Sequence, residues 1–154
     1  MEIVLVEPEI PHNTGCAARL AAATGVPLHL VEPLGFSLDD RRVRRSGLDY
    51  WPRVRPRVWP DWRSFVDALP ELGEPYLLSP RTPRPYWSIQ FPDRVVLLFG
   101  RESTGLPEPL RARFPDRLIG IPMRDDGLRA LNLATTVGVA GFEVMRQWSA
   151  RGGP

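Results

Sequence analysis

Three segments of the chain place glycine and polar side chains directly after a short apolar run. They cover residues 7–19, 99–107 and 120–132. Glycine lets the backbone approach a bound ligand closely, and in parallel sheets ligands gather beyond the carboxyl ends of the strands. The three segments are therefore candidate loops of a binding site.

Two polar side chains in these segments have both a functional and a structural explanation. Arg19 is the only charged residue between Thr14 and Thr24. Its guanidinium could meet an anion or a substrate hydroxyl, or it could extend into solvent. Asn132 precedes an apolar helical stretch, and a helix cap would explain it by itself. His12 is more typical of a loop residue than of a catalytic base.

Several other chemistries are excluded by what the sequence lacks. The run LLFGRESTGLP is superficially similar to a phosphate-binding loop, but the Gly-Lys-Ser/Thr ending is missing and the chain has no lysine. No GxGxxG follows an apolar run, so the usual dinucleotide fingerprint is missing too. One cysteine and two histidines are too few for a zinc site. Cys16 can form no internal disulfide, which favours a cytoplasmic protein.

The charge pattern indicates an anionic partner. All 20 basic residues are arginine, and the formal net charge is +2. Residues 41–63 contain eight arginines against Asp49 and Asp61, a local charge of +6. Aromatic residues among these arginines could stack on RNA bases; they are Tyr50, Trp51, Trp59 and Trp62. Alternatively the rings belong to the core, which we expect for Trp62, because it shares a helical stripe with residues 65 and 69.

Apolar runs separated by proline and glycine predict an α/β domain with a mainly parallel sheet and flanking helices. Strands are expected at residues 3–6, 28–31, 76–78, 95–99 and 118–121. Helices are expected at residues 15–24, 39–45, 61–69, 107–114 and 131–148. Asn13 or Thr14 would cap the first helix and Gly25 would end it. We expect one domain over residues 1–150 with a short tail at 151–154, no signal peptide and no membrane span.

The last predicted helix has two apolar faces. One carries larger side chains, at positions 133, 137, 140, 144 and 148, and the other is mostly small, at positions 134, 138, 141 and 145. Packing on the protein's own sheet would be a sufficient cause. The width of the apolar surface also favours a subunit interface.

The sequence resembles the SPOUT superfamily of RNA methyltransferases, and within it the TrmL (YibK) group, which methylates the wobble nucleotide of tRNA. The resemblance covers about residues 2–148. It rests on EPEIPHNTGCAARL, HLVEPLGFSLDDRRVRRSGLDY, LLFGRESTGLP and IPMRDDGLRALNL. It implies a SPOUT fold with a C-terminal trefoil knot and an active site shared between the subunits of a homodimer.

The resemblance also implies a reaction. S-adenosyl-L-methionine would donate a methyl group to the ribose 2′-hydroxyl of nucleotide 34 in the anticodon stem-loop of tRNA, without a metal. The implied catalytic residues are Arg19, Asn13, Glu102 and Asn132. The implied cofactor-binding residues are Leu78, Ser79, Pro80, Phe99, Gly100, Glu102, Ile121, Met123, Ala130 and Leu131. The implied RNA-binding residues are Arg41, Arg42, Arg44, Arg45 and Arg129.

Two departures from the family pattern leave alternatives open. Ala130 stands where the family commonly has serine, and Phe142 where it usually has tyrosine. The lost hydroxyls would weaken positioning of the cofactor or RNA, although the backbone at Ala130 can still contact the cofactor. One alternative is an RNA-binding protein that keeps the scaffold with little or no catalysis. Another is a 2′-O-methyltransferase of a different RNA, such as ribosomal RNA.

Overall fold

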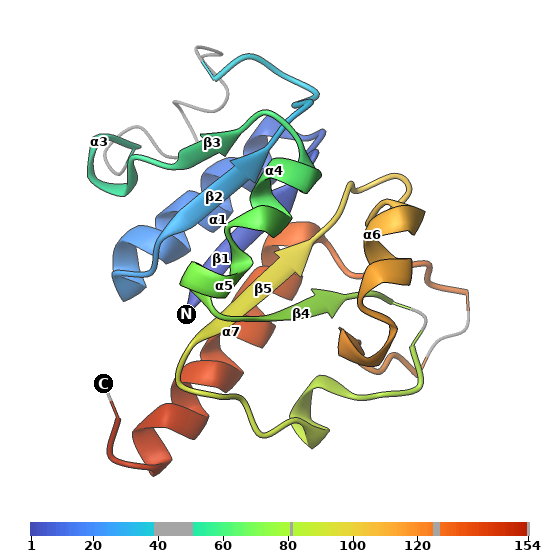
Figure 1. Cartoon of the computed structure of the whole chain (residues 1–154). Helices are drawn as coiled ribbons and strands as arrows, with labels where there is room; N and C mark the ends of the chain where they lie inside the picture. Colours follow the sequence, from blue (N-terminus) through green and yellow to red (C-terminus); the bar gives the residue numbers. More distant parts are fainter. Residues whose placement is uncertain (39–50, 81, 125–126, 154) are drawn as a thin grey trace.

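The computed structural model describes residues 1–38, 51–80, 82–124 and 127–153. Its centre is one sheet of six parallel strands in the order β3-β2-β1-β5-β4-β6 (Figure 1). The strands are β1 (Glu2–Val6), β2 (Leu28–Val31), β3 (Arg57–Trp59), β4 (Glu74–Leu78), β5 (Val95–Phe99) and β6 (Leu118–Ile119). The expected α/β architecture is confirmed.

The strands that the sequence predicted best are those buried on both faces. Strands β2 and β5 have the predicted bounds, and every residue in them is buried. Strand β6 is two residues shorter than predicted, since Gly120 forms only an isolated bridge with Pro85. Strand β3 was not predicted, because three residues, two of them exposed, carry too little apolar pattern.

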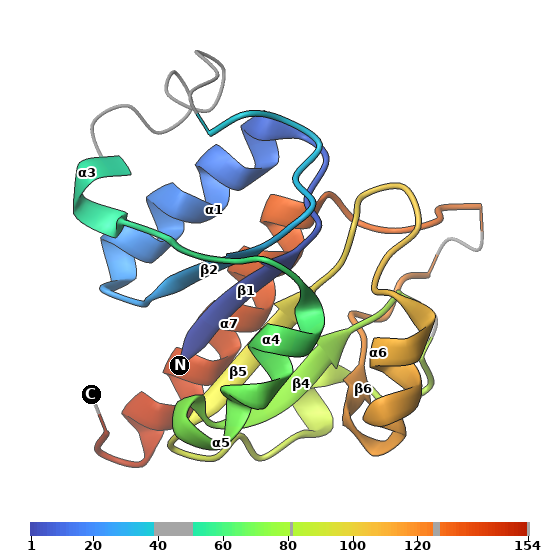
Figure 2. The ribbon, with the colours of Figure 1, turned by 45° about the horizontal axis from the view of Figure 1, so that its top comes forward.

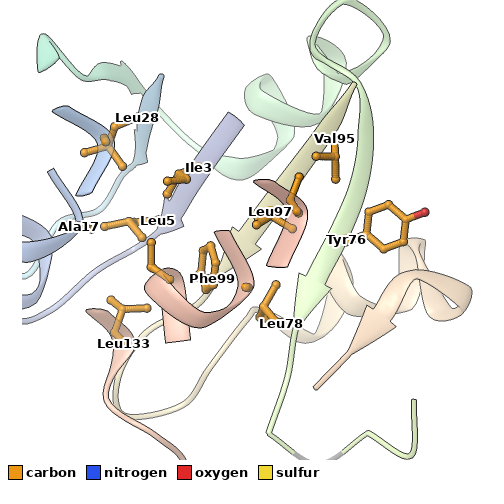
Figure 3. Packing of buried hydrophobic residues seen from close by; sticks show 14 of the residues in the cluster. Ile3, Leu5, Ala17, Leu28, Tyr76, Leu78, Val95, Leu97, Phe99 and Leu133 are labelled. Carbon is orange, nitrogen blue, oxygen red and sulfur yellow. The ribbon is translucent and has the colours of Figure 1, made fainter. Parts of the chain in front are cut away.

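Helices cover both faces of the sheet (Figure 2). They are α1 (Pro11–Thr24), α3 (Trp51–Val54), α4 (Trp62–Asp67), α5 (Leu69–Leu72), α6 (Glu108–Arg113) and α7 (Leu133–Ala150). Alternate residues of β1 point to opposite faces, as the period of a strand requires. Ile3 and Leu5 pack with α1 and α7, and Figure 3 shows Leu5 beside Phe99 and Leu133. Val4 and Val6 pack with α4, α5 and α6.

Helix α1 begins four residues earlier than the sequence predicted. Pro11 occupies the first turn, where its missing N–H is not needed, and no side chain caps the helix. The prediction that Asn13 or Thr14 caps this helix is therefore wrong, because both are buried inside its first turn. The predicted end is confirmed, since Gly25 has φ +69° and donates its N–H to Ala21.

The predicted helix at 61–69 is two short helices. Asp61 caps α4 by accepting a hydrogen bond from the Ser64 N–H (2.7 Å). Trp62 packs partly buried against the core, as expected. The predicted helix at 39–45 lies outside the described residues. No described helix is long and apolar enough to cross a membrane.

The larger apolar face of α7 is buried as predicted. Val137, Ala140 and Val144 have no exposed surface, and Trp148 packs at the edge of the core. Part of the small face is also internal, because a Cβ on Gly141 would lie 3.8 Å from Leu20 of α1. A large residue at position 141 would therefore strain the packing within this chain, and a test of a subunit interface needs a more exposed position.

Trp59 belongs to the core, so the hypothesis that its ring stacks on RNA is wrong. Trp59 is 8% exposed, and its ring centroid lies 5.5 Å from that of Phe65, edge to face. Its Nε1–H donates to Nδ1 of His29 (3.0 Å). Because Nδ1 accepts this bond, neutral His29 carries its proton on Nε2 and donates it to Glu2 (2.9 Å).

Replacing Trp59 with phenylalanine should therefore lower the free energy of unfolding by about 1–3 kcal/mol. The change removes the indole N–H, which is the only donor of a tryptophan side chain. Nδ1 of His29 then stays buried without this hydrogen bond. Urea unfolding would measure the loss, and Trp62→Phe is the matched control at a partly buried ring. Equal losses in the two variants would mean that ring volume, and not the hydrogen bond, matters.

Candidate active site

A cavity of about 770 Å³ lies beyond the carboxyl ends of β4, β5 and β6. This volume is in the range of small-molecule and cofactor sites. Its wall includes all ten residues that the resemblance implied for the cofactor: Leu78, Ser79, Pro80, Phe99, Gly100, Glu102, Ile121, Met123, Ala130 and Leu131. Because parallel strands end at the same edge of the sheet, the loops that follow them meet there although they are distant in sequence.

Glu102 connects the loop after β5 to the start of α1. One carboxylate oxygen accepts from the N–H of Glu9 (2.8 Å). The other accepts from the N–H of Ile10 (3.3 Å) and from Nδ2 of Asn13 (2.9 Å). Three donors hold this carboxylate in one orientation, so Glu102 can position the loops around the cavity.

Asn13 and Asn132 continue this network to the last helix. Nδ2 of Asn132 donates to Oδ1 of Asn13 (2.9 Å). Oδ1 of Asn132 accepts from the N–H groups of Ala134 (2.9 Å) and Thr135 (3.2 Å). The helix-cap explanation of Asn132 is thus confirmed, and the same side chain also links α7 to α1. Both asparagines line the cavity.

Glu9 and Ser103 form a second link that sequence reasoning missed. The two oxygens of Glu9 accept from the N–H (2.9 Å) and the hydroxyl (2.8 Å) of Ser103. The hydroxyl and then the backbone N–H of Ser103 lower the pKa of Glu9 below its usual 4.5. This link therefore stabilises the folded protein at pH values above the usual pKa of a glutamate. The stabilisation is lost as the pH falls through the lowered pKa of Glu9.

Gly100 allows the loop after β5 to fold back on itself. A Cβ at this position would lie 2.1 Å from the Leu106 nitrogen and 2.2 Å from the Gly105 carbonyl carbon. The backbones of Arg101 and Gly105 hydrogen-bond to each other in both directions, and Gly105 has φ +76°. The close approach that glycine permits here is thus between two parts of the loop.

Arg19 lies apart from the other three implied catalytic residues. Asn13, Glu102 and Asn132 line the cavity, whereas the exposed Arg19 does not. The structure therefore brings together three of the four within one chain.

Among the residues expected to bind RNA, only Arg129 lies in the described part of the chain. It lines the cavity and donates to the carbonyl of Ser103 (2.9 Å). Arg129 thus joins the loop after β6 to the loop after β5. Arg41, Arg42, Arg44 and Arg45 fall outside the described residues.

The arrangement suits a reaction that depends on positioning. Loops from three strands enclose the cavity, and its polar side chains hydrogen-bond to one another across those loops. In the described part of the chain, no group of three His, Cys, Asp or Glu side chains is placed to hold a metal ion. Backbone groups, short polar side chains and the guanidinium groups of Arg101 and Arg129 are what the site offers to a ligand.

Comparison with known families identifies the chain. The profile of the SpoU rRNA Methylase family matches residues 1–142, which is most of the chain. The chain belongs to this family. A tRNA (cytidine(34)-2′-O)-methyltransferase of Burkholderia cenocepacia (strain HI2424) is 48% identical to this SpoU family member, over 98% of this chain and 97% of the relative.

Solved structures agree with this membership. A structure described as giving insight into 2′-OH methylation of C/U34 on tRNA is 45% identical and superimposes with a TM-score of 0.91, covering 97% of each chain. The SpoU methyltransferase AviRb from Streptomyces viridochromogenes, in complex with AdoMet, is 22% identical with a TM-score of 0.83. The superposition covers 97% of this chain and 61% of AviRb. At this sequence identity, the similarity shows the shared fold alone.

Proposed function

We propose that this SpoU family member transfers a methyl group from S-adenosyl-L-methionine to the ribose 2′-hydroxyl of nucleotide 34, the wobble nucleotide, of a tRNA. The observation that carries the proposal is the cavity, whose wall contains all ten residues implied for the cofactor. The near full-length similarity to a tRNA (cytidine(34)-2′-O)-methyltransferase supports the substrate. We place the reaction in the cytoplasm and assign it to one domain, residues 1–150.

The cavity fits the cofactor by size and by the chemistry of its wall. Leu78, Phe99, Ile121 and Leu131 supply apolar surface for an adenine ring, and the loop backbones supply hydrogen-bonding groups. When bound, S-adenosylmethionine supplies a methyl group already activated by its sulfonium charge. The chain then has to hold the ribose hydroxyl in line with that methyl group and keep water away.

The four implied catalytic residues divide between two tasks in this proposal. Glu102, Asn13 and Asn132 fix the loops that form the cavity wall through their mutual hydrogen bonds. Arg19 meets the ribose hydroxyl, where its guanidinium orients the oxygen and stabilises the negative charge that develops on it. An arginine stays protonated in proteins and is a poor base, so the hydroxyl proton would pass to water or to an RNA phosphate as the methyl group leaves the sulfonium sulfur and bonds to the oxygen.

We infer that Arg19 reaches the cavity of a second subunit in a homodimer. Arg19 is exposed on α1 and is absent from the wall of its own cavity. Helix α1 packs beside α7. On α7, the Phe142 side chain is 55% exposed, and a Cβ added at Gly138 would meet no other atom within 4 Å. A second copy that covers this surface would bury an apolar side chain and complete the site.

Replacing Phe142 with glutamate should accordingly convert the dimer to a species of about 17.4 kDa. A charge at the centre of a buried interface would be desolvated without a partner. Sedimentation at micromolar concentration would measure the mass, and Trp87→Glu provides a control at a similarly exposed ring on another surface. If Phe142→Glu remains dimeric, the interface lies elsewhere.

We also propose the trefoil knot that the resemblance implies. On one side of β6, the Ser79 N–H donates to the Ile119 carbonyl (2.9 Å). On the other side, Gly120 donates to Arg84 (2.9 Å) and accepts from Tyr86 (2.8 Å). The chain after β4 therefore passes along both sides of β6 before β5 begins, and this enclosure supports threading of the C-terminal segment.

Nucleoside mass spectrometry tests the proposed function directly. The purified protein is incubated with S-adenosylmethionine and unmodified tRNA, and the digested nucleosides are compared with a reaction lacking protein. The expected product is 2′-O-methylcytidine or 2′-O-methyluridine located at position 34. Methylation confined to ribosomal RNA would replace the proposed substrate. RNA binding without cofactor binding would favour a scaffold that has lost catalysis.

A further inference from the structure

Glu7 has an unfavourable backbone conformation at the entrance to the first cavity loop. Its φ is +54°, and among the described non-glycine residues only Arg55 also has a positive φ. Residues with a Cβ rarely adopt this conformation, and it persists where surrounding contacts enforce it, often at functional sites. Glu7 directly follows β1, and its N–H donates to the Val31 carbonyl (2.8 Å).

The Glu7 side chain is buried and forms an ion pair with Arg101. The side chain is 10% exposed, and one of its oxygens contacts a terminal nitrogen of the Arg101 guanidinium. A buried carboxylate is costly unless it is paired, so this contact fixes the guanidinium as well as the carboxylate. Arg101 itself is 37% exposed along its side chain and lines the cavity.

Two other carboxylates at this edge of the sheet, Glu9 and Glu102, are held by other donors. Glu9 accepts two hydrogen bonds from Ser103, and Glu102 accepts three from the start of α1. The Arg101 backbone is also fixed, because its N–H and carbonyl both pair with Gly105. Backbone and side chain together therefore hold one guanidinium at the cavity wall.

We propose that Arg101 binds an oxyanion of a ligand in the cavity and that Glu7 is the positioning residue that aims its guanidinium. The oxyanion is either the carboxylate of the methyl donor or a phosphate of the RNA, so the inference rests on the proposed function. A guanidinium has five N–H donors in a planar fork, so it can contact Glu7 and an oxyanion together.

The pair of Glu74 and Arg117 provides a matched control. Arg117 is also 37% exposed, but Glu74 is 50% exposed and has an ordinary backbone conformation. The Arg117 guanidinium donates to the Tyr76 hydroxyl (3.0 Å), and neither residue of the pair lines the cavity. Neutralising this pair changes the same chemical groups at a surface that is not part of the site.

The first experiment compares Arg101→Gln with Arg117→Gln. Calorimetry gives dissociation constants for S-adenosylmethionine and for its decarboxylated analogue, and filter binding gives those for tRNA across a salt series. If Arg101 binds the cofactor carboxylate, Arg101→Gln weakens binding of S-adenosylmethionine by about tenfold to a hundredfold and leaves the analogue unaffected. If Arg101 binds an RNA phosphate, the affinity for the cofactor is unchanged. The slope of log tRNA affinity against log salt concentration then becomes shallower by about 0.7.

The second experiment tests whether Glu7 acts through Arg101. Glu7→Gln should weaken binding of the same ligand, Glu74→Gln should not, and the double variant at positions 7 and 101 should lose no more than Arg101→Gln alone. Arg101→Lys should restore part of the loss, since it keeps the charge without the planar fork.

Three different results would contradict three different parts of this proposal. If folded Arg101→Gln binds both ligands as the unchanged protein does, with the same salt slope, the inference is overturned. If additive losses appear in the double variant, Glu7 has a separate structural role and is not the positioning residue. If the unchanged protein binds neither S-adenosylmethionine nor tRNA, the proposed function fails and this inference fails with it.

Discussion

Replacing Arg19 with alanine is expected to abolish methyl transfer and to leave binding of S-adenosylmethionine nearly unchanged. Arg19 lies outside the wall of its own cavity, so its loss removes no cofactor contact within the chain. Its guanidinium is proposed to act on the ribose hydroxyl, where lost charge stabilisation affects only the transfer step. Initial rates with tRNA and calorimetry with the cofactor measure the two effects separately.

The exposed Arg113 on α6 provides the control for this change, since it does not line the cavity. Arg113→Ala should retain its turnover. An Arg19→Ala protein that keeps more than half of its turnover would show that Arg19 is only a surface charge.

A mixing experiment decides which subunit supplies Arg19. Arg19→Ala is mixed in equal amounts with a variant whose cavity cannot bind the cofactor, and the subunits are allowed to exchange. If Arg19 acts in the partner's cavity, each mixed dimer contains one intact site, and about a quarter of the original activity returns. If Arg19 acts in its own subunit, every site carries a defect and activity stays absent.

Replacing Gly100 with alanine is expected to weaken cofactor binding severely and to destabilise the protein. The new methyl group would lie 2.1 Å from the Leu106 nitrogen, and this neighbour is backbone, which cannot turn aside. The loop would have to open, which separates Arg101 from Gly105 and displaces Glu102. Overpacking of this kind costs about 1–3 kcal/mol, and urea unfolding and calorimetry would measure both consequences.

Gly141→Ala is the matched control, because a Cβ there would make ordinary contacts of 3.8 Å inside a helix. Alanine is also favoured over glycine within helices, so this variant should be as stable as the unchanged protein or more stable. If Gly100→Ala behaves like Gly141→Ala, the loop after β5 tolerates rearrangement and its close approach is not needed for binding.

Elements with strong local signals could be predicted from the sequence alone. Strand β5 is a continuous apolar run that ends at Gly100, and α7 carries apolar residues at helical spacing behind the cap Asn132. In both, nearby residues determine the conformation. The beginning of α1 was misjudged because Asn13 is a typical cap, and only the fold shows its amide bonded to Glu102 and Asn132.

Motif resemblance identified many of the residues of the cavity wall, but their arrangement depends on contacts between distant parts of the chain. Glu9 and Ser103 are 94 positions apart, and no local pattern marks either as a partner of the other. The pairing of β6 with β4 and the exclusion of Arg19 from its own cavity are likewise set by chain topology. Local spacing and composition were enough to indicate which residue types could serve the site. Which of these residues meet depends on the fold, because hydrogen bonds and packing between remote segments form only once the sheet has brought the strand ends together.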